Sequence, residues 1–161
     1  MAIQTNLAGL STVKIEVSGG SLQSLGYARN EPEVIFNPFF HDVPSDENGG
    51  DQGPPVEVQF LGAIAMVRMR LTRYDPAVCA IVERFATSLT AGQPGTAGLL
   101  MFSNAVTLRI LIDNANDPRN FPRCIPRSPI EMNKGSKFTE LSLEFYAYKN
   151  ASGVLWNAST S

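Results

Sequence analysis

The chain has 161 residues, of which 43% are hydrophobic and 17% charged, and this composition excludes an intrinsically disordered protein. Thirteen basic and fifteen acidic residues give a formal net charge of −2, which argues against a dedicated nucleic-acid-binding protein because no concentrated basic field can replace phosphate counterions. The length predicts one domain, residues 1–161, that buries its own core.

Membrane and secretion signals are weak in this sequence. The longest apolar run, residues 60–67, is far too short to span a bilayer and ends at Arg68. The first ten residues lack the basic segment and long apolar core of a secretory signal. We therefore expect a soluble protein of a reducing cytosol, without a membrane partner. Its two cysteines, Cys79 and Cys124, are expected to stay reduced, with a disulfide between them as the alternative.

In chain order, the first predicted strands are short. Residues 13–17 alternate apolar and polar side chains, and residues 33–37 form a second extended segment. The next stretch, 38–55, reads PFFHDVPSDENGGDQGPP and predicts a long irregular loop. Loops of this length are usually functional or disordered, and exposing two phenylalanines on a monomer is costly. We predict that 38–55 is a contact loop that becomes ordered against a partner.

The central stretch predicts two strands that lead into a helix. Apolar residues occupy every second position in 56–60 and again in 67–71. Asp75 and Pro76 then favour a helix start, because Asp caps free amides and Pro is preset for the first helical position. Apolar residues at helical spacing predict a helix over 76–89, docked on a sheet.

The second half of the chain predicts further strands at 98–103, 106–113 and 138–148. Residues 114–129, with four prolines and three arginines, are predicted to be irregular. The whole pattern predicts a mainly β fold: a β-sandwich or open barrel of about six to eight strands, with one α-helix packed on it and long Gly/Pro-rich loops. In the last strand, the predicted inward-facing residues are Leu141, Leu143, Phe145 and Ala147.

The residues that could carry chemistry do not form a recognisable catalytic or metal-binding pattern. The single histidine, His41, lies near Asp42 and Asp46, but the spacing is not that of a calcium loop. One histidine and two cysteines do not supply a zinc site. Glu140 and Glu144 are four residues apart on one strand, roughly 13 Å, which is too far for a glycosidase pair. We therefore predict no enzymatic activity, no catalytic residues, no metal and no cofactor.

Two predicted loops of opposite charge favour self-association. The loop 38–55 carries four acidic residues and 114–129 carries three arginines, so the acidic loop of one copy would meet the basic loop of the next. Such a contact joins different surfaces of identical subunits and propagates into rings or filaments. The alternative is that both loops are merely solvated. The predicted subunit-interface residues are Phe39, Phe40, Asp42, Asp46, Glu47, Asp51, Arg119, Arg123 and Arg127.

Two stretches carry a resemblance to a known family: PVEVQFLGAIAMVRMRLTRYDPAVCAIVERF and FPRCIPRSPIEMNKGSKFTELSLEFYAYKNASGVLW. In their order of strand pair, Asp-Pro-led helix, Pro-rich Cys-containing loop and long strand before a glycine turn, the sequence resembles the major tail tube protein of long-tailed bacteriophages and related contractile injection systems. The two stretches cover less than half of the chain, and the resemblance is one of pattern and not of a diagnostic motif.

The resemblance implies a virion structural protein whose hexameric rings join their sheets into a continuous β-barrel and stack into a tube that conducts DNA. The implied partners are further copies of the chain, a tape measure protein, a tail terminator, a sheath protein where the tail contracts, and DNA without sequence-specific binding. The implied location is the virion tail, and the host cytoplasm during assembly. The stretch 38–55 matches the position of the family's long loop, which reaches neighbouring subunits and rings.

Within the family, the lumen of the tube is generally electronegative. The candidate lumen-facing residues of this chain are Glu57, Glu140 and Glu144, although Arg68 and Arg70 share a similar outward setting.

Two other functions fit the same pattern. A capsid decoration protein, or a tail-completion or terminator protein, would share the fold but form finite oligomers. A ligand-binding β-sandwich would use Tyr146, Tyr148 and Trp156 as a sugar-stacking surface.

Overall fold

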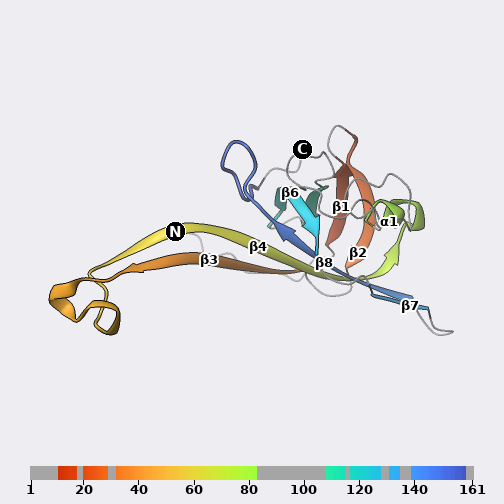
Figure 1. Ribbon diagram of the computed structural model, residues 1–161. Coiled ribbons are helices and arrows are strands. Elements are labelled where there is room, and N and C mark those ends of the chain that lie inside the picture. The colour runs from red at the N-terminus through yellow and green to blue at the C-terminus, as the bar shows by residue number, and fades with distance from the viewer. Residues whose placement is uncertain are drawn as a thin grey trace, which may run out of the picture.

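The computed structural model describes residues 11–17, 20–28, 32–82, 108–114, 117–127, 131–134 and 139–158. These residues form an eight-stranded sheet, one α-helix and two short 3-10 helices (Figure 1), which confirms the prediction of a mainly β fold with a helix. The elements are β1 (Thr12–Val17), β2 (Gln23–Ala28), β3 (Glu33–Val43), η1 (Asp46–Asn48), η2 (Gly50–Gln52), β4 (Glu57–Tyr74), α1 (Pro76–Val82), β5 (Leu108–Asp113), β6 (Arg119–Pro126), β7 (Glu131–Lys134) and β8 (Thr139–Ala147).

The sheet closes on itself. The strand order is β3-β4-β2-β1-β5-β6-β8-β7, and a further pairing of β4 with β8 joins β4, β2, β1, β5, β6 and β8 into a ring in which each strand is antiparallel to its neighbours. Strands β3 and β7 add to this ring along β4 and β8. The result is a barrel body from which the β3–β4 hairpin extends to one side (Figure 1).

Alternation of apolar and polar residues fills the barrel. Every second residue of β4 from Ala65 to Leu71 is buried, since successive side chains of a strand point to opposite faces. Opposite them on β8, the four residues predicted to face inward are all 3% exposed or less, which confirms that prediction. The core therefore lies between the inner faces of the ring, with Phe121 and Phe145 as its largest fully buried side chains.

Helix α1 begins where the sequence predicted. The Oδ1 atom of Asp75 accepts a hydrogen bond from the backbone N–H of Ala77 at 2.8 Å, and Pro76 occupies the first helical position. Val78, Cys79 and Val82 of the helix are buried against the barrel. The predicted continuation, 83–89, lies outside the described residues. No helix in the described ranges has the length and hydropathy needed to cross a bilayer.

The two predicted strands at 56–60 and 67–71 are one 18-residue strand, β4. A bulge replaces the predicted break: Phe39 pairs with Gly62 and Phe40 with Phe60, which leaves Leu61 as the extra residue. Gly62 has a φ of +130°, a conformation that side-chain-bearing residues rarely adopt. The predicted interruption between the two strands is therefore a single bulge.

Two further predictions need correction. Residues 38–43 are not loop but the outer part of β3, because β3 lies at a sheet edge, where Pro38 is tolerated. Residues 119–126 are not irregular but form β6, in which Pro122 falls at a register shift against β5. The strands β2 and β7 were not predicted, and the predicted strand 98–103 lies outside the described residues.

Candidate assembly interface

The most prominent feature of the fold is the outer part of the β3–β4 hairpin, residues 39–61, which we call the arm. The antiparallel register of β3 and β4 continues to the pair Val43 and Glu57, and the backbone N–H of Val56 donates to the carbonyl oxygen of Val43 at 3.0 Å. The helices η1 and η2 form the tip between the strands. Figure 1 shows that the arm extends well beyond the barrel body.

Large apolar side chains on the arm are exposed to solvent. The rings of Phe40 and Phe60 contact each other with centroids 5.6 Å apart, yet the two residues are 57% and 60% exposed. The alternation of apolar residues in 56–60 predicts a strand with one buried face. In the single chain that prediction is wrong, because no part of the described body covers this face. Half-exposed apolar residues on the arm are Phe39, Phe40, Val56, Val58, Phe60 and Leu61.

The aromatic side of the arm continues the core-facing side of the barrel. In the body, Phe36 pairs with Ala65, which is fully buried on the inner face. Four residues further along β3, on the same side, Phe40 pairs with Phe60. The same alternation that builds the core thus produces an uncovered apolar strip once the hairpin leaves the body, and a strip of this kind is typical of a protein interface.

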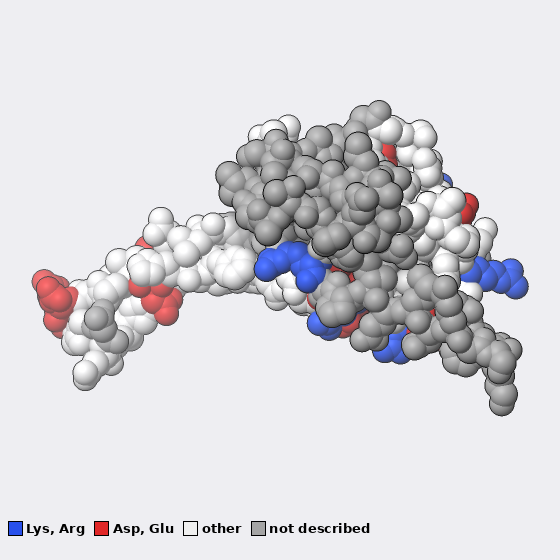
Figure 2. Space-filling model, turned by 45° about the vertical axis from the view of Figure 1, so that its right-hand side comes forward, with Lys and Arg blue, Asp and Glu red and all other residues white. Residues whose placement is uncertain are grey.

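The charge of the chain is divided between the arm and the body. The arm contains five acidic residues and no Lys or Arg, so its formal charge is −5; the rest of the chain has thirteen basic and ten acidic residues, a formal charge of +3. In Figure 2, acidic side chains lie on the extended hairpin and Lys and Arg side chains lie on the body, one group close to where the hairpin joins it.

The predicted acidic interface residues all belong to the arm. Asp42 is exposed on β3, and Asp46 and Glu47 are exposed in η1 at the tip, while Asp51 belongs to η2. Together with the exposed Phe39 and Phe40 of β3, they form one continuous part of the molecule. Their role in subunit contacts stays a prediction.

The three predicted arginines lie along β6 and just after it, where this part of the chain meets the end of β8 and the segment 149–158, which we call the C-terminal strap. We call this line of contacts the seam. Arg119 forms a two-bonded ion pair with Asp117, at 2.9 Å for each bond, and its guanidinium lies 4.1 Å from the centroid of the Trp156 ring. Arg123 donates to the carbonyl oxygen of Lys149 at 3.3 Å. The structure therefore brings these arginines to one surface, although each also holds a partner within its own chain.

Arg127 ends the same seam. Its Nη1 atom donates to the hydroxyl oxygen of Tyr148 at 2.8 Å, and its guanidinium lies 5.0 Å from the centroid of the Tyr146 ring. The hydrogen bond to Tyr148 stabilises the charged form and raises the pKa of Arg127. Arg119 and Arg127, at the two ends of the seam, thus each lie over an aromatic ring.

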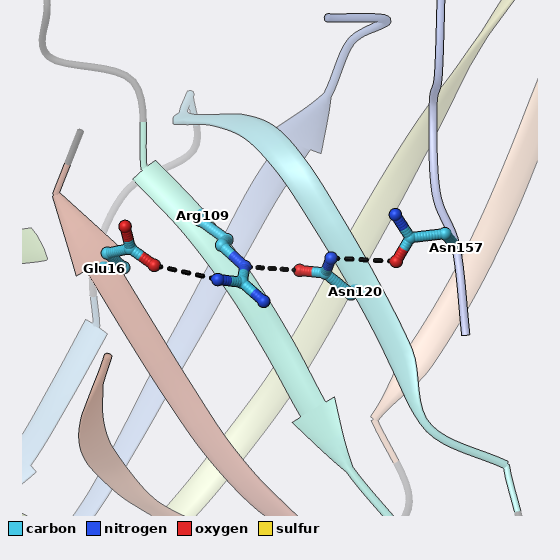
Figure 3. A network of polar contacts seen from close by, with 4 residues as sticks. All are labelled: Glu16, Arg109, Asn120 and Asn157. Carbon is cyan, nitrogen blue, oxygen red and sulfur yellow. Dashed lines mark hydrogen bonds and ion pairs between the residues drawn. The ribbon is translucent and has the colours of Figure 1, made fainter. Parts of the chain in front are cut away.

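A polar network attaches the strap to the barrel (Figure 3). Asn120 of β6, 4% exposed, exchanges two backbone hydrogen bonds with Asn157 at 2.9 and 3.0 Å, and its Nδ2 donates to the side-chain oxygen of Asn157 at 2.9 Å. Arg109 of β5 donates to Asn120 at 2.8 Å and to Glu16 of β1 at 3.0 Å. Sequence reasoning missed this network because its members are far apart in the chain and none belongs to a local motif.

The candidate lumen-facing glutamates do not form one group. Glu57 lies on the arm, paired with Val43 across the hairpin. Glu140 and Glu144 lie on the outer face of β8, where they form ion pairs with Arg70 at 3.7 Å and Arg68 at 2.5 Å. The hydrogen bond and the negative charge of Glu144 raise the pKa of Arg68. The shared setting of arginines and glutamates noted in the sequence is therefore a set of cross-strand ion pairs.

The described residues define a closed antiparallel barrel with an exposed hairpin arm, and this fold has known relatives. No protein-family model and no curated protein matches the sequence. One similar solved structure is a chain from "Virion of native gene transfer agent (GTA) particle", with a TM-score of 0.52 and 12% identity over 87% of this chain and 92% of that one.

A second similar structure is a chain from "Tail of empty GTA particle computed with helical refinement, C6 symmetry", with a TM-score of 0.51 and 13% identity. The match covers 92% of this chain and 95% of that one. Each match covers most of both chains, so the whole fold is shared and not only the barrel. At this level of identity the similarity concerns the fold, and function has to be argued from the surface of this chain.

Proposed function

We propose that this protein is a structural subunit of a phage-like tail, and that it self-assembles into stacked hexameric rings that form the tail tube and conduct DNA. The observation that carries the proposal is the arm: an apolar, acidic hairpin that its own barrel leaves uncovered. The fold supports the same proposal, because the similar chains come from a gene transfer agent virion and from a tail with C6 symmetry.

Magnitudes favour the apolar side chains of the arm as the source of affinity. Fully burying a Phe, Leu or Val side chain is worth roughly 1.5–3 kcal/mol, so each half-exposed side chain gains about 1 kcal/mol when a neighbour covers it. Six such residues lie on the arm. Exposed ion pairs contribute only about 0–1 kcal/mol each. Burial of the arm would therefore drive association, and its acidic charge would select which surface of the neighbour it meets.

The opposite charges of arm and body favour a head-to-tail contact. A contact between two different surfaces of identical chains repeats in the same sense from copy to copy, so it closes into a ring or continues as a filament. A tape measure protein, a tail terminator, a sheath protein in a contractile tail, and passing DNA are the further partners that this proposal includes. The proposed role is structural, with no catalytic step.

Two alternatives are separable from the tube. A capsid decoration or tail-completion protein would use the same arm but stop at single rings or other finite oligomers. A sugar-binding module would stack its ligand on aromatic faces, and the guanidinium groups of Arg119 and Arg127 already occupy one face of the Trp156 ring and of the Tyr146 ring. That packing favours an interface or structural role for these aromatic residues.

The proposal is tested by examining the concentrated, purified protein by sedimentation velocity and negative-stain electron microscopy. We expect stacked rings or hollow tubes of uniform width. The informative variant replaces residues 39–62, which include the whole arm with its exposed apolar side chains, by an Asn-Gly turn, because β3 and β4 are already paired at Pro38 and Ala63 and Asn-Gly suits a two-residue hairpin. This short-arm variant should fold normally and lose stacking.

Outcomes separate the candidate functions. Single rings without stacking would support the decoration or completion role. A wild-type protein that sediments as a monomer up to its solubility limit would contradict self-assembly, and a short-arm variant that still forms tubes would contradict the assignment of the arm.

A further inference from the structure

The surface that receives the arm can be inferred from what else is exposed on the body, an inference that rests on the proposed self-assembly. We propose that Phe40 and Phe60 of one copy dock on Phe36 and Trp156 of the next copy, beside Arg119. We call these three receiving residues the base cluster, because they lie where the hairpin leaves the barrel.

The base cluster is assembled from three distant parts of the chain. The rings of Phe36 in β3 and Trp156 in the strap have centroids 6.3 Å apart and are tilted by 48°. The guanidinium of Arg119 in β6 lies 4.1 Å from the centroid of the Trp156 ring. The cluster is held in place from behind, since the neighbouring Asn157 is bonded to Asn120 by backbone and side chain. It is therefore a preformed surface and not a loose end of the chain.

The cluster is also open to solvent, with Phe36 42% and Trp156 38% exposed. Among the described residues outside the arm, the exposed large hydrophobic residues are Phe36, Trp156 and Tyr27. Tyr27 belongs to β2, whereas Phe36 and Trp156 touch each other. Of these residues, only the touching pair offers two adjacent aromatic rings to the two adjacent rings of the arm.

Charge supports the same pairing. Asp42 lies on the Phe40 side of the arm and pairs across the hairpin with Val58. Arg119 belongs to the base cluster, and the seam that continues from it carries Arg123, Arg127 and Lys149. With Asp117 as the acidic residue of the described ranges 117–127 and 149–158, this seam has a formal charge of +3. The arm, residues 39–61, carries five acidic residues and no Lys or Arg. An acidic aromatic strip thus faces a basic aromatic cluster, which gives both attraction and orientation.

The contact has to form between copies. Phe36 and Phe40 lie on the same strand, β3, four residues or roughly 13 Å apart, so the arm of a chain does not reach the base cluster of that chain. Each copy carries one arm and one base cluster, at different places on its surface. The pairing is therefore heterologous and leaves every receiving copy with its own arm available for the next one.

Cysteine cross-linking tests the pairing without removing any aromatic ring. Val58→Cys places a thiol beside Phe40 and Phe60, on the same face of the arm and 50% exposed in the wild type. Ala158→Cys places one at an exposed position of the strap, two residues from Trp156. The two single variants are mixed and treated with a short bismaleimide, then separated on a denaturing gel. Wild type is the background control, since Cys79 and Cys124 are buried.

We expect a covalent dimer in the mixture that neither single variant forms alone. The matched control mixes Val58→Cys with Tyr27→Cys, which places the second thiol at an exposed aromatic residue of β2, away from the base cluster, and should give at least about tenfold less dimer. A second measurement uses Trp156, the only tryptophan of the chain: its fluorescence spectrum should shift on assembly, and Trp156→Ser should weaken association at least about tenfold while Trp156→Phe preserves it.

The results distinguish this inference from the proposed function. Tubes or rings that form without a Val58–Ala158 dimer, or with equal Tyr27 cross-linking, would overturn the base cluster and leave self-assembly standing. A Val58–Ala158 dimer in a protein that forms neither rings nor tubes would support the contact and contradict the tube. A protein with neither assembly nor dimer would contradict both.

Discussion

Phe40 and Phe60 face each other across the two strands of the arm, with ring centroids 5.6 Å apart, and more than half of each residue is exposed. In a barrel core, such a pair would be covered from the other side by a second sheet. Here the hairpin has left the barrel, so the pair has the composition of a core and the exposure of a surface. In the proposed assembly, a second copy would cover this pair.

We therefore predict that Phe60→Ala weakens self-association by about 10- to 100-fold, or about 1.4–2.8 kcal/mol, as a central aromatic interface residue should. The variant should not lower the melting temperature of the monomer, because Phe60 packs little within its own chain. Sedimentation equilibrium and thermal unfolding provide the two readouts. Tyr27→Ala, an exposed aromatic residue of β2, is the control and should change association by less than about twofold. Equal effects of the two substitutions would contradict the role of the arm.

Electrostatic attraction between the arm and the body predicts that the rate of assembly depends on salt concentration. Raising the salt concentration from about 0.05 to about 0.5 M shortens the screening length severalfold and should slow assembly followed by light scattering. The double substitution Asp46→Lys and Glu47→Lys at the tip should slow assembly at low salt and make the remaining rate nearly independent of salt. Assembly that accelerates with salt in the wild type would show that apolar burial alone selects the contact.

The network around Asn120 predicts a strong effect on stability. Asn120→Leu removes the acceptor of Arg109 and the donor to Asn157, and it leaves partly buried polar groups without these bonds. We expect a loss of about 2–3 kcal/mol in the free energy of unfolding, from unsatisfied groups that cost about 1–3 kcal/mol each. Urea denaturation measures it, with Ser152→Ala on the exposed turn of the strap as control. A change below about 0.5 kcal/mol would mean that the network does not hold the strap.

Alanine substitutions at two glycines should lower the stability of the fold by different amounts and for different reasons. A Cβ atom added at Gly26 would lie 2.1 Å from the carbonyl oxygen of Arg73, and only a shift of β2 against β4 can relieve this clash with the backbone. A Cβ atom added at Gly62 would meet nothing within 4 Å. Gly26→Ala should therefore cost more than about 3 kcal/mol of stability. Gly62→Ala should cost only the strain of its positive φ, about 1–2 kcal/mol. Denaturant unfolding of the two variants compares them directly.

The buried thiol of Cys124 predicts low reactivity. Burial disfavours the thiolate and raises the pKa of Cys124, so the group stays protonated in the folded protein at pH 8, where an ordinary exposed cysteine is partly ionised. A thiol-specific reagent should modify Cys124 at pH 8 only after denaturation, as peptide mapping would show. Rapid modification of the native protein would mean that β6 opens easily from the barrel.

Several elements could be predicted from local patterns alone. Alternation identified the buried face of β8, and Asp75 followed by Pro76 identified the start of α1, because period-two burial and helix capping depend on neighbours in sequence. Proline and glycine counts were misleading at 38–43 and 119–126. Whether Pro38 and Pro122 interrupt a strand depends on edge position and bulges, which are properties of the whole sheet.

The sequence by itself determined that the chain is mainly β, that its strands have one apolar face, and that it carries an acidic aromatic stretch and a basic one. The pairing of β3 with β4 makes the acidic stretch part of a two-stranded arm, and the tertiary contacts bring Phe36, Arg119 and Trp156 together at its base. The physical reason is that alternation specifies which side of a strand is apolar but not what covers it. That depends on how far β3 and β4 extend past the barrel, and on where the C-terminal strap crosses it.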